Sequence, residues 1–134
     1  MKVGVVTDDN KTISPHFGRA QYYLVYEIQD GKILSKETRP KSSHHHRDEV
    51  QLHRSEVEET GHNPDGHSEA SLHDSMLSNV RDCEALITGG IGYGMYASIK
   101  QLGIKPYVTS TAIADDAIQA YIKGTLDNHI ERLH

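Results

Sequence analysis

The sequence predicts an α/β domain built on a mixed five-stranded sheet with helices on its faces. Short runs of β-branched and aromatic residues are typical of strands, and an Asp-Gly pair between two of them is a hairpin signal. In the second half, strand-like runs alternate with apolar residues at helical spacing, which is typical of parallel strands joined by helical crossovers. With 134 residues, 36% of them hydrophobic, residues 1–134 are expected to form a single domain.

The first half of the chain should contain three strands. Residues 2–7 are rich in valine and end at the turn cluster Asp8-Asp9-Asn10. Residues 22–28 form a second, tyrosine-rich strand. Asp30-Gly31 then fits a two-residue turn with positive φ, and a third strand follows from Lys32. The second and third strands should therefore be antiparallel neighbours.

The second half should alternate helices and strands. A first helix has its apolar stripe at Leu72, Met76, Val80 and Cys83, with Ser68 or Ser71 at its start. A buried strand over 84–88 follows, and the next helix should end at Gly103. A last strand over 104–109 leads to a helix that Thr111 can cap and that Gly124 ends.

The middle of the chain is an acidic, histidine-rich insertion at about residues 41–70. Seven of the ten histidines lie between His44 and His73. Residues 41–75 contain three basic and eight acidic side chains, which accounts for the whole net charge of −5. Neutral imidazole is the commonest side-chain metal ligand, and an acidic segment favours cations. The composition therefore indicates metal handling and argues against nucleic-acid binding, which needs clustered lysine and arginine.

The spacing of these histidines does not identify a metal. It matches no closed zinc signature, and the chain has a single cysteine, Cys83, which is expected to be buried. The alternative is a solvated loop that binds metals only adventitiously. The candidate ligands in the insertion are His44, His45, His46, His62 and His67.

A second candidate site lies in the loop after the first strand, in the segment Ser14-Pro15-His16-Phe17-Gly18-Arg19-Ala20. Ligands of open α/β sheets bind at the carboxyl edge of the strands, where this loop should lie. Pro15 stiffens the approach to His16, and Gly18 permits close approach of a ligand or an unusual φ. His16 is therefore a candidate metal ligand. The alternative is that its imidazole hydrogen-bonds a neighbouring carbonyl.

Gly89-Gly90-Ile91-Gly92 follows a predicted strand and opens a helix. Backbone N–H groups at such a helix start can receive an anionic ligand, although the glycines could equally serve only a tight turn and close packing. The dinucleotide-binding pattern fails because Met95 stands where its third glycine belongs, and no P-loop lysine follows.

Two carboxylates after the first strand, Asp8 and Asp9, raise the option of metal-dependent hydrolysis. No partner carboxylate follows the strand that ends at Thr88, which counts against it. The N-terminus has no apolar signal core, and no apolar run approaches 18 residues. We therefore expect a cytoplasmic protein without a membrane segment.

Taken in order, these motifs resemble the dinitrogenase iron–molybdenum cofactor biosynthesis family of nitrogenase accessory factors. The resemblance rests on His16-Phe17-Gly18-Arg19, the Asp-Gly hairpin, the histidine-containing middle segment and Gly89-Gly90-Ile91-Gly92. It implies a ribonuclease-H-like fold and the non-catalytic binding or carriage of a metal–sulfur cofactor or its precursor. It also implies His16 as a ligand, a nearby glycine loop, and donor and acceptor proteins for the cluster.

Three functions remain open from the sequence. The first is a carrier of a metal–sulfur cluster or transition metal, which is not an enzyme. The second is a divalent-metal buffer or sensor that uses only the histidines of the insertion. The third is a hydrolase of a small phosphorylated substrate that uses Asp8, Asp9 and the glycine loop. We rank them in that order.

Overall fold

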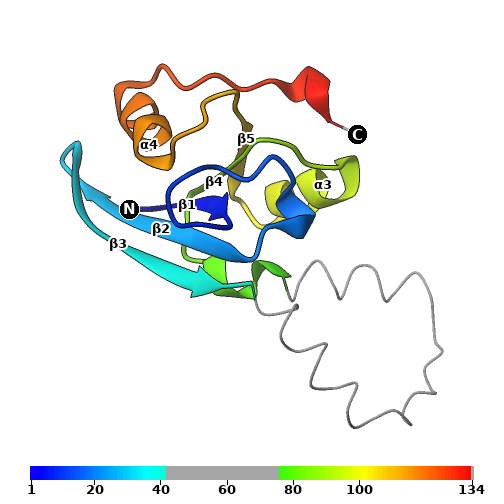
Figure 1. Ribbon diagram of the computed structural model, residues 1–134, viewed down its shortest axis with the longest axis horizontal. Helices are drawn as coiled ribbons and strands as arrows, with labels where there is room; N and C mark the ends of the chain where they lie inside the picture. The colour runs from blue at the N-terminus through cyan, green and yellow to red at the C-terminus, as the bar shows by residue number, and fades with distance from the viewer. Residues whose placement is uncertain (42–75, 134) are drawn as a thin grey trace, which may run out of the picture.

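The computed structural model describes residues 1–41 and 76–133, which form an α/β fold around one five-stranded sheet (Figure 1). The strand order is β3-β2-β1-β4-β5. β1 pairs antiparallel with β2, and β2 with β3, whereas β4 runs parallel to both β1 and β5. The predicted fold is therefore confirmed. The strands are β1 (Lys2–Thr7), β2 (Tyr22–Gln29), β3 (Lys32–Pro40), β4 (Ala85–Thr88) and β5 (Lys105–Val108).

The turn between β2 and β3 has the predicted conformation. Asp30 and Gly31 have φ values of 53° and 74°, which are the positive angles of a type I′ turn. This turn matches the twist of the flanking strands, so β3 extends for nine residues beside β2.

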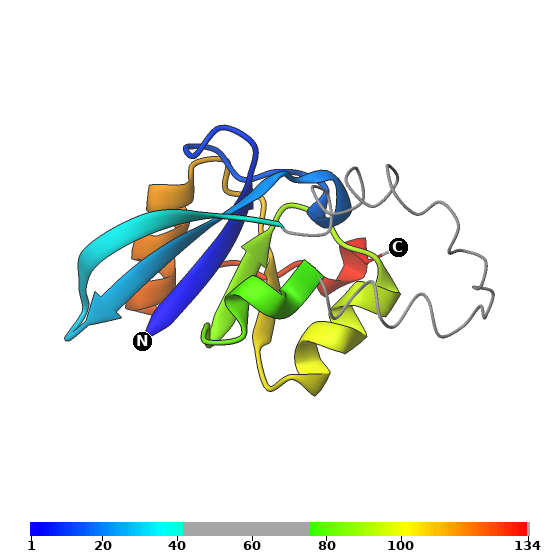
Figure 2. The same cartoon turned by 90° about the horizontal axis from the view of Figure 1, so that it is seen from below.

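The sheet is covered on both faces because its strands alternate between two cores. Val6, Tyr23 and Leu86 point to the face covered by α3 (Tyr93–Gln101) and Met76–Val80. Val5 and Ile87 point to the opposite face, which α4 (Ala114–Lys123) covers (Figure 2). Successive side chains of a strand point to opposite faces of the sheet, which is why neighbouring residues belong to different cores.

The glycine that ends each of these two helices was predicted correctly, but the cap of the last one was not. Gly103 and Gly124 have φ values of 83° and 77°. The last helix begins after Ile113, and Thr111 makes no side-chain cap. The N–H of Ala114 donates instead to the carbonyl of Lys11, 2.9 Å away in the turn after β1.

The helix expected to end at Cys83 ends earlier. Met76 and Leu77 are helical, the chain tightens into the 3-10 turn η3 (Ser78–Val80), and Cys83 lies beyond it. The N–H of Cys83 still bonds to the carbonyl of Val80, 3.0 Å away, so its side chain stays in the core next to Gly4. Ser68, Ser71 and Leu72 lie outside the described residues.

The C-terminal segment covers the outer edge of β5. The N–H of His129 donates to the carbonyl of Val108 at 2.6 Å, and the N–H of Val108 donates to Oδ1 of Asn128 at 2.9 Å. A short 3-10 helix, η4 (Ile130–Arg132), follows. These bonds satisfy backbone groups that an edge strand would otherwise expose. Within the described residues, no helix has both the length and the apolar character needed to cross a membrane.

An ion pair joins the end of β3 to the turn before β4. Arg39 binds Asp82 through two nitrogens, at 2.9 and 3.2 Å, and Lys2 lies 3.3 Å from the same carboxylate. The hydrogen bonds from Arg39 lower the pKa of Asp82 to about 2, from an ordinary value of 3.8. The pair therefore stabilises the fold fully at pH values above the ordinary pKa of aspartate. This contribution is lost as the pH falls towards 2.

We expect Asp82→Asn to lower the free energy of unfolding at pH 7 by about 1 kcal/mol, since the pair is bidentate but partly exposed. The difference from wild type should shrink between pH 5 and pH 2. Urea denaturation across this range measures it. Asp30→Asn is the matched control, because asparagine fits the positive φ there. Equal losses in the two variants at pH 7 would contradict the prediction.

Candidate functional site: a histidine loop at the carboxyl edge of the sheet

The loop between β1 and β2 lies at the edge where β1, β4 and β5 all end, because these strands are parallel. The register pairs Tyr22 with both Thr7 and Pro40, so β2 starts and β3 ends at the same edge. This edge therefore gathers the His16 loop, the glycine loop after β4 and the start of the histidine-rich insertion.

Ser14 fixes the backbone on the N-terminal side of His16. The Ser14 hydroxyl accepts from the N–H of His16 at 3.2 Å and lies 3.1 Å from its carbonyl, to which it donates. The N–H of Ser14 bonds in turn to the carbonyl of Val6, 2.9 Å away at the end of β1. The loop is thus held to the strand that precedes it.

The glycine loop fixes the other side. The N–H of Phe17 donates to the carbonyl of Gly90 at 2.9 Å, and the N–H of Gly89 donates to the carbonyl of Ser14 at 2.9 Å. A Cβ on Gly90 would lie 2.4 Å from the carbonyl oxygen of Pro15, and one on Gly89 would lie 3.0 Å from the Pro15 Cα. Both glycines are required because the two loops pack backbone to backbone.

This packing changes the predicted role of the glycine loop. The N–H of Gly89 is used by Ser14, and the N–H of Gly90 lies 3.3 Å from the Thr88 hydroxyl. Both groups are thus used within the protein, the first of them in joining the two loops, and the binding of an anionic ligand by the glycine loop stays a prediction. Gly92 is the N-cap residue of α3 and has no side-chain cap.

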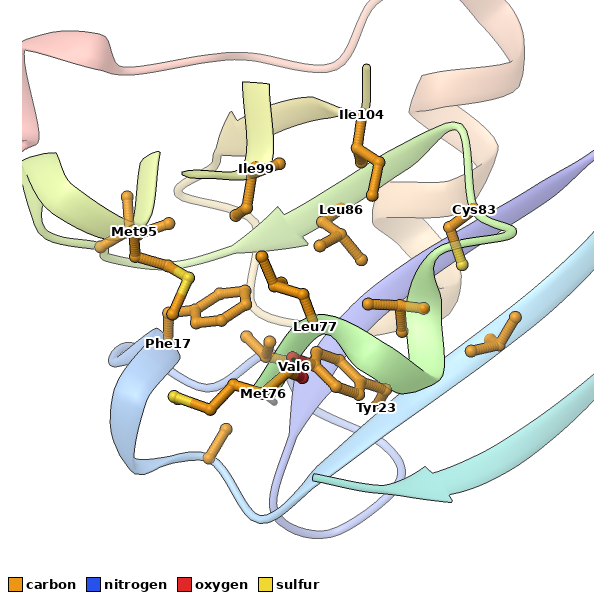
Figure 3. Close-up of a cluster of buried hydrophobic side chains, with 14 of the residues drawn as sticks. Val6, Phe17, Tyr23, Met76, Leu77, Cys83, Leu86, Met95, Ile99 and Ile104 are labelled. Atoms are coloured by element: carbon orange, nitrogen blue, oxygen red, sulfur yellow. Dashed lines mark hydrogen bonds between the residues drawn. The ribbon is translucent and has the colours of Figure 1, made fainter. Parts of the chain in front are cut away.

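Phe17 anchors the loop in the core. It starts the 3-10 turn η1 (Phe17–Arg19), is 1% exposed and packs against Tyr23 with ring centroids 6.0 Å apart. Figure 3 shows its ring between Met95 of α3 and the side chains around Leu77. The N–H groups of Arg19 and Ala20 both bond to the carbonyl of His16 at 3.2 Å. The backbone of His16 is therefore fixed on both sides.

The His16 side chain is exposed. Within residues 1–41 and 76–133 its imidazole makes no hydrogen bond or ion pair, so the alternative of a bond to a neighbouring carbonyl is not observed. Gly18 has no positive φ, and a Cβ there would meet no atom within 4 Å. Gly18 and the exposed Arg19 leave the solvent side of the loop open.

The residues that flank the histidine-rich segment are anchored to η1 at one end and to β2 at the other. The chain leaves β3 at Lys41, which is 1% exposed and donates from its Nζ to the carbonyl of Phe17. It returns at Met76, whose carbonyl accepts from the Tyr23 hydroxyl at 2.6 Å. Sequence reasoning missed Lys41, because a lysine that opens a polar segment is usually solvated.

The other predicted metal ligands lie outside the described residues: His44, His45, His46, His62 and His67. In the described part of the chain, no three side chains of the ligand-forming types are grouped to hold a metal ion. His129 lies between Asp127 and Glu131, at 2.8 and 2.9 Å from their carboxylates. Cys83 is buried, which raises the pKa of its thiol to about 12 and keeps it protonated.

The two carboxylates of the hydrolase hypothesis are engaged in the turn after β1. Asp9 accepts from the N–H groups of Thr12 and Lys11 at 2.8 and 3.0 Å, and these bonds lower its pKa to about 2. Asp8 accepts from the N–H of Gln21 at 2.9 Å. Asp9 thus shapes the turn, which is a structural role typical of aspartate.

The fold and this loop define a class: small α/β proteins that present a histidine at the carboxyl edge of a mixed sheet. A family model described as dinitrogenase iron-molybdenum cofactor matches residues 1–124, and the chain belongs to this family. The resemblance found in the sequence is thereby confirmed. The family is associated with the iron–molybdenum cofactor, which is a metal–sulfur cluster.

The chain also resembles individual proteins. An uncharacterized protein of Methanocaldococcus jannaschii is 30% identical over 127 residues, which is 95% of this chain and 90% of the relative. The crystal structure of the protein PH0822 has a TM-score of 0.65 and 21% identity, covering 98% of both chains. The apo form of the orange protein from Desulfovibrio gigas has a TM-score of 0.61 and 14% identity, covering 96% and 92% of the two chains. The two structural likenesses establish the fold.

Proposed function

We propose that the protein binds a metal–sulfur cofactor or its precursor as cargo, without turnover, and passes it between donor and acceptor proteins. His16 is its principal ligand among the described residues. The single observation that carries the proposal is an exposed imidazole with no hydrogen-bond or ion-pair partner among residues 1–41 and 76–133, on a loop whose backbone is fixed on both sides. Family membership supplies the class of cargo.

The fixed backbone favours binding because the ligand is already in position. Ser14 and Gly90 hold the residues on either side of the His16 side chain, and Phe17 is buried in the core. Ordering a free loop on binding would cost conformational entropy. A loop that is already held in this way loses little further conformational entropy when the cargo binds. Imidazole nitrogen is also a suitable ligand for iron and other transition metals.

A small number of protein ligands fits a carrier better than a permanent metal centre. The described residues supply one candidate imidazole, and Cys83 stays protonated in the core. In a metal–sulfur cluster, sulfide fills part of the coordination of each metal, so the protein supplies fewer ligands for each metal than it does to a bare ion. The insertion histidines His44, His45, His46, His62 and His67 follow Lys41 in the chain and are proposed as additional ligands. Few protein ligands allow transfer of the cargo.

The experiment is cluster uptake by protein purified without air and supplied with ferrous iron and sulfide. We expect His16→Ala to bind the cluster at least about tenfold more weakly than wild type, which is a loss of about 1.4 kcal/mol or more, and therefore to retain much less metal. Metal and acid-labile sulfide analysis, with the visible absorption spectrum, measures it. His134→Ala is the control, because it also removes one imidazole.

The insertion separates this proposal from the metal-buffer hypothesis. A variant with His44, His45 and His46 all replaced by alanine tests the first group of its histidines. If that variant loses all metal while His16→Ala binds like wild type, the carrier proposal centred on His16 is wrong. If His16→Ala alone removes the cluster, the proposal stands and the insertion has a secondary role.

A further inference from the structure

Lys41 is a cation buried directly behind the His16 loop. It follows the last residue of β3, its side chain is 1% exposed, and its Nζ donates to the carbonyl of Phe17. The same nitrogen lies 4.5 Å from the centroid of the Phe17 ring and 5.6 Å from that of Tyr23. Its own N–H bonds to the carbonyl of Gln21, 3.2 Å away. The whole residue is therefore packed against η1 and the start of β2.

Burying an ammonium group in this position costs desolvation free energy, which suggests that the charge has a function. Burial lowers the pKa of Lys41 to about 8, with the Asp8 carboxylate opposing that effect, so the amine is mostly protonated at neutral pH. An ammonium has three donors, and the Phe17 carbonyl is the one hydrogen-bond acceptor found for it among the described residues. A methionine would bury a similar stem without the desolvation cost.

We propose that Lys41 determines the charge specificity of the His16 site, so that the site prefers an anionic metal–sulfur species to a free divalent cation. This inference rests on the proposed function and concerns the same site. The carbonyl that Lys41 holds belongs to Phe17, the residue next to His16. The buried ammonium therefore lies against the backbone next to the proposed ligand, and its electric field acts on a cargo bound to the imidazole.

The sign of the effect follows from Coulomb's law. A positive charge in a partly desolvated position repels a bare metal cation and attracts an anion, and the interaction is stronger there than in water. Arg19, exposed on η1, adds charge of the same sign, whereas Asp8 at the end of β1 partly offsets it. Metal–sulfur clusters with several sulfides are commonly anionic, so the local charge favours them over free nickel or zinc ions.

The test compares two probes on wild-type protein and on Lys41→Met. Tetrathiomolybdate is a metal–sulfur dianion, and nickel(II) is a free divalent cation. We expect the affinity for tetrathiomolybdate to fall about tenfold in the variant, whereas nickel binding should be unchanged or tighter. Isothermal titration calorimetry at pH 7 measures both. Lys32→Met is the matched control, because Lys32 lies at the opposite end of β3.

Lys41→Gln is a second variant that separates the loss of charge from a folding defect. Glutamine keeps a donor for the Phe17 carbonyl but removes the charge. It should show the same change in preference as Lys41→Met while thermal unfolding remains cooperative. Equal weakening of both probes would overturn the inference, because Lys41 would then only hold the loop in place. Unchanged affinities for both probes would overturn it as well.

Failure of the proposed function gives a different result. If wild-type protein does not bind tetrathiomolybdate, or if His16→Ala binds it equally well, the carrier proposal fails and the role of Lys41 falls with it. If binding depends on His16 but not on the charge at position 41, only the inference about Lys41 is wrong.

Discussion

Replacing Gly90 with alanine should destabilise the protein by about 3 kcal/mol, because the added methyl group has no space and the core cannot relax around it. Its Cβ would lie 2.4 Å from the Pro15 carbonyl oxygen, and that oxygen belongs to backbone rather than to a flexible side chain. Moving the two loops apart would also break the bond from the Phe17 N–H to the Gly90 carbonyl. Urea denaturation followed by circular dichroism measures the change.

The same substitution should weaken cargo binding, since it displaces the loop that holds His16. Gly18→Ala is the matched control in the same site: its Cβ would meet no atom within 4 Å and its φ is not positive. Its stability should stay within about 0.5 kcal/mol of wild type. If the two variants are equally stable, the close approach of the glycine loop to Pro15 does not contribute to the fold as described.

The sheet was predictable because its signals are local. Alternation in the strands, the Asp30-Gly31 turn and the glycines after the helices each act through a few neighbouring residues. Thr111 was predicted wrongly as a cap because the residue that satisfies the helix start, Lys11, lies about a hundred positions away in the chain. Helix boundaries depend on such tertiary contacts and are less predictable than helix existence.

The site was only partly predictable for the same reason. His16 and the glycine loop have recognisable motifs, but the use of the Gly89 and Gly90 N–H groups within the protein depends on packing between distant segments. Lys41 carries no signal in the sequence, since its burial follows from the position of Phe17 and Tyr23. The insertion is recognisably rich in histidine, but its composition does not show which of these side chains come together around one metal.

Phe17→Ala should have the largest effect of any substitution near the site, with a loss of about 3–5 kcal/mol in the free energy of unfolding. The ring is 1% exposed and contacts Tyr23, and the Lys41 amine lies 4.5 Å from its centroid. Its removal leaves a cavity and takes the aromatic surface from a buried cation. Since small domains are stable by only about 5–15 kcal/mol, this loss is a large fraction of the total and should clearly lower the unfolding temperature.

Tyr93→Ala is the control for the loss of an aromatic ring, because Tyr93 is 66% exposed at the first residue of α3. It should change stability by less than about 1 kcal/mol. Denaturant titrations of both variants, with equal slopes as a check on two-state unfolding, decide the comparison. The burial of the Phe17 ring holds η1 in the core and so fixes the backbone of His16, the preceding residue. A Phe17→Ala loss no greater than that of Tyr93→Ala would mean that Phe17 does not anchor the loop. In that case the fixed position of His16 would need another cause.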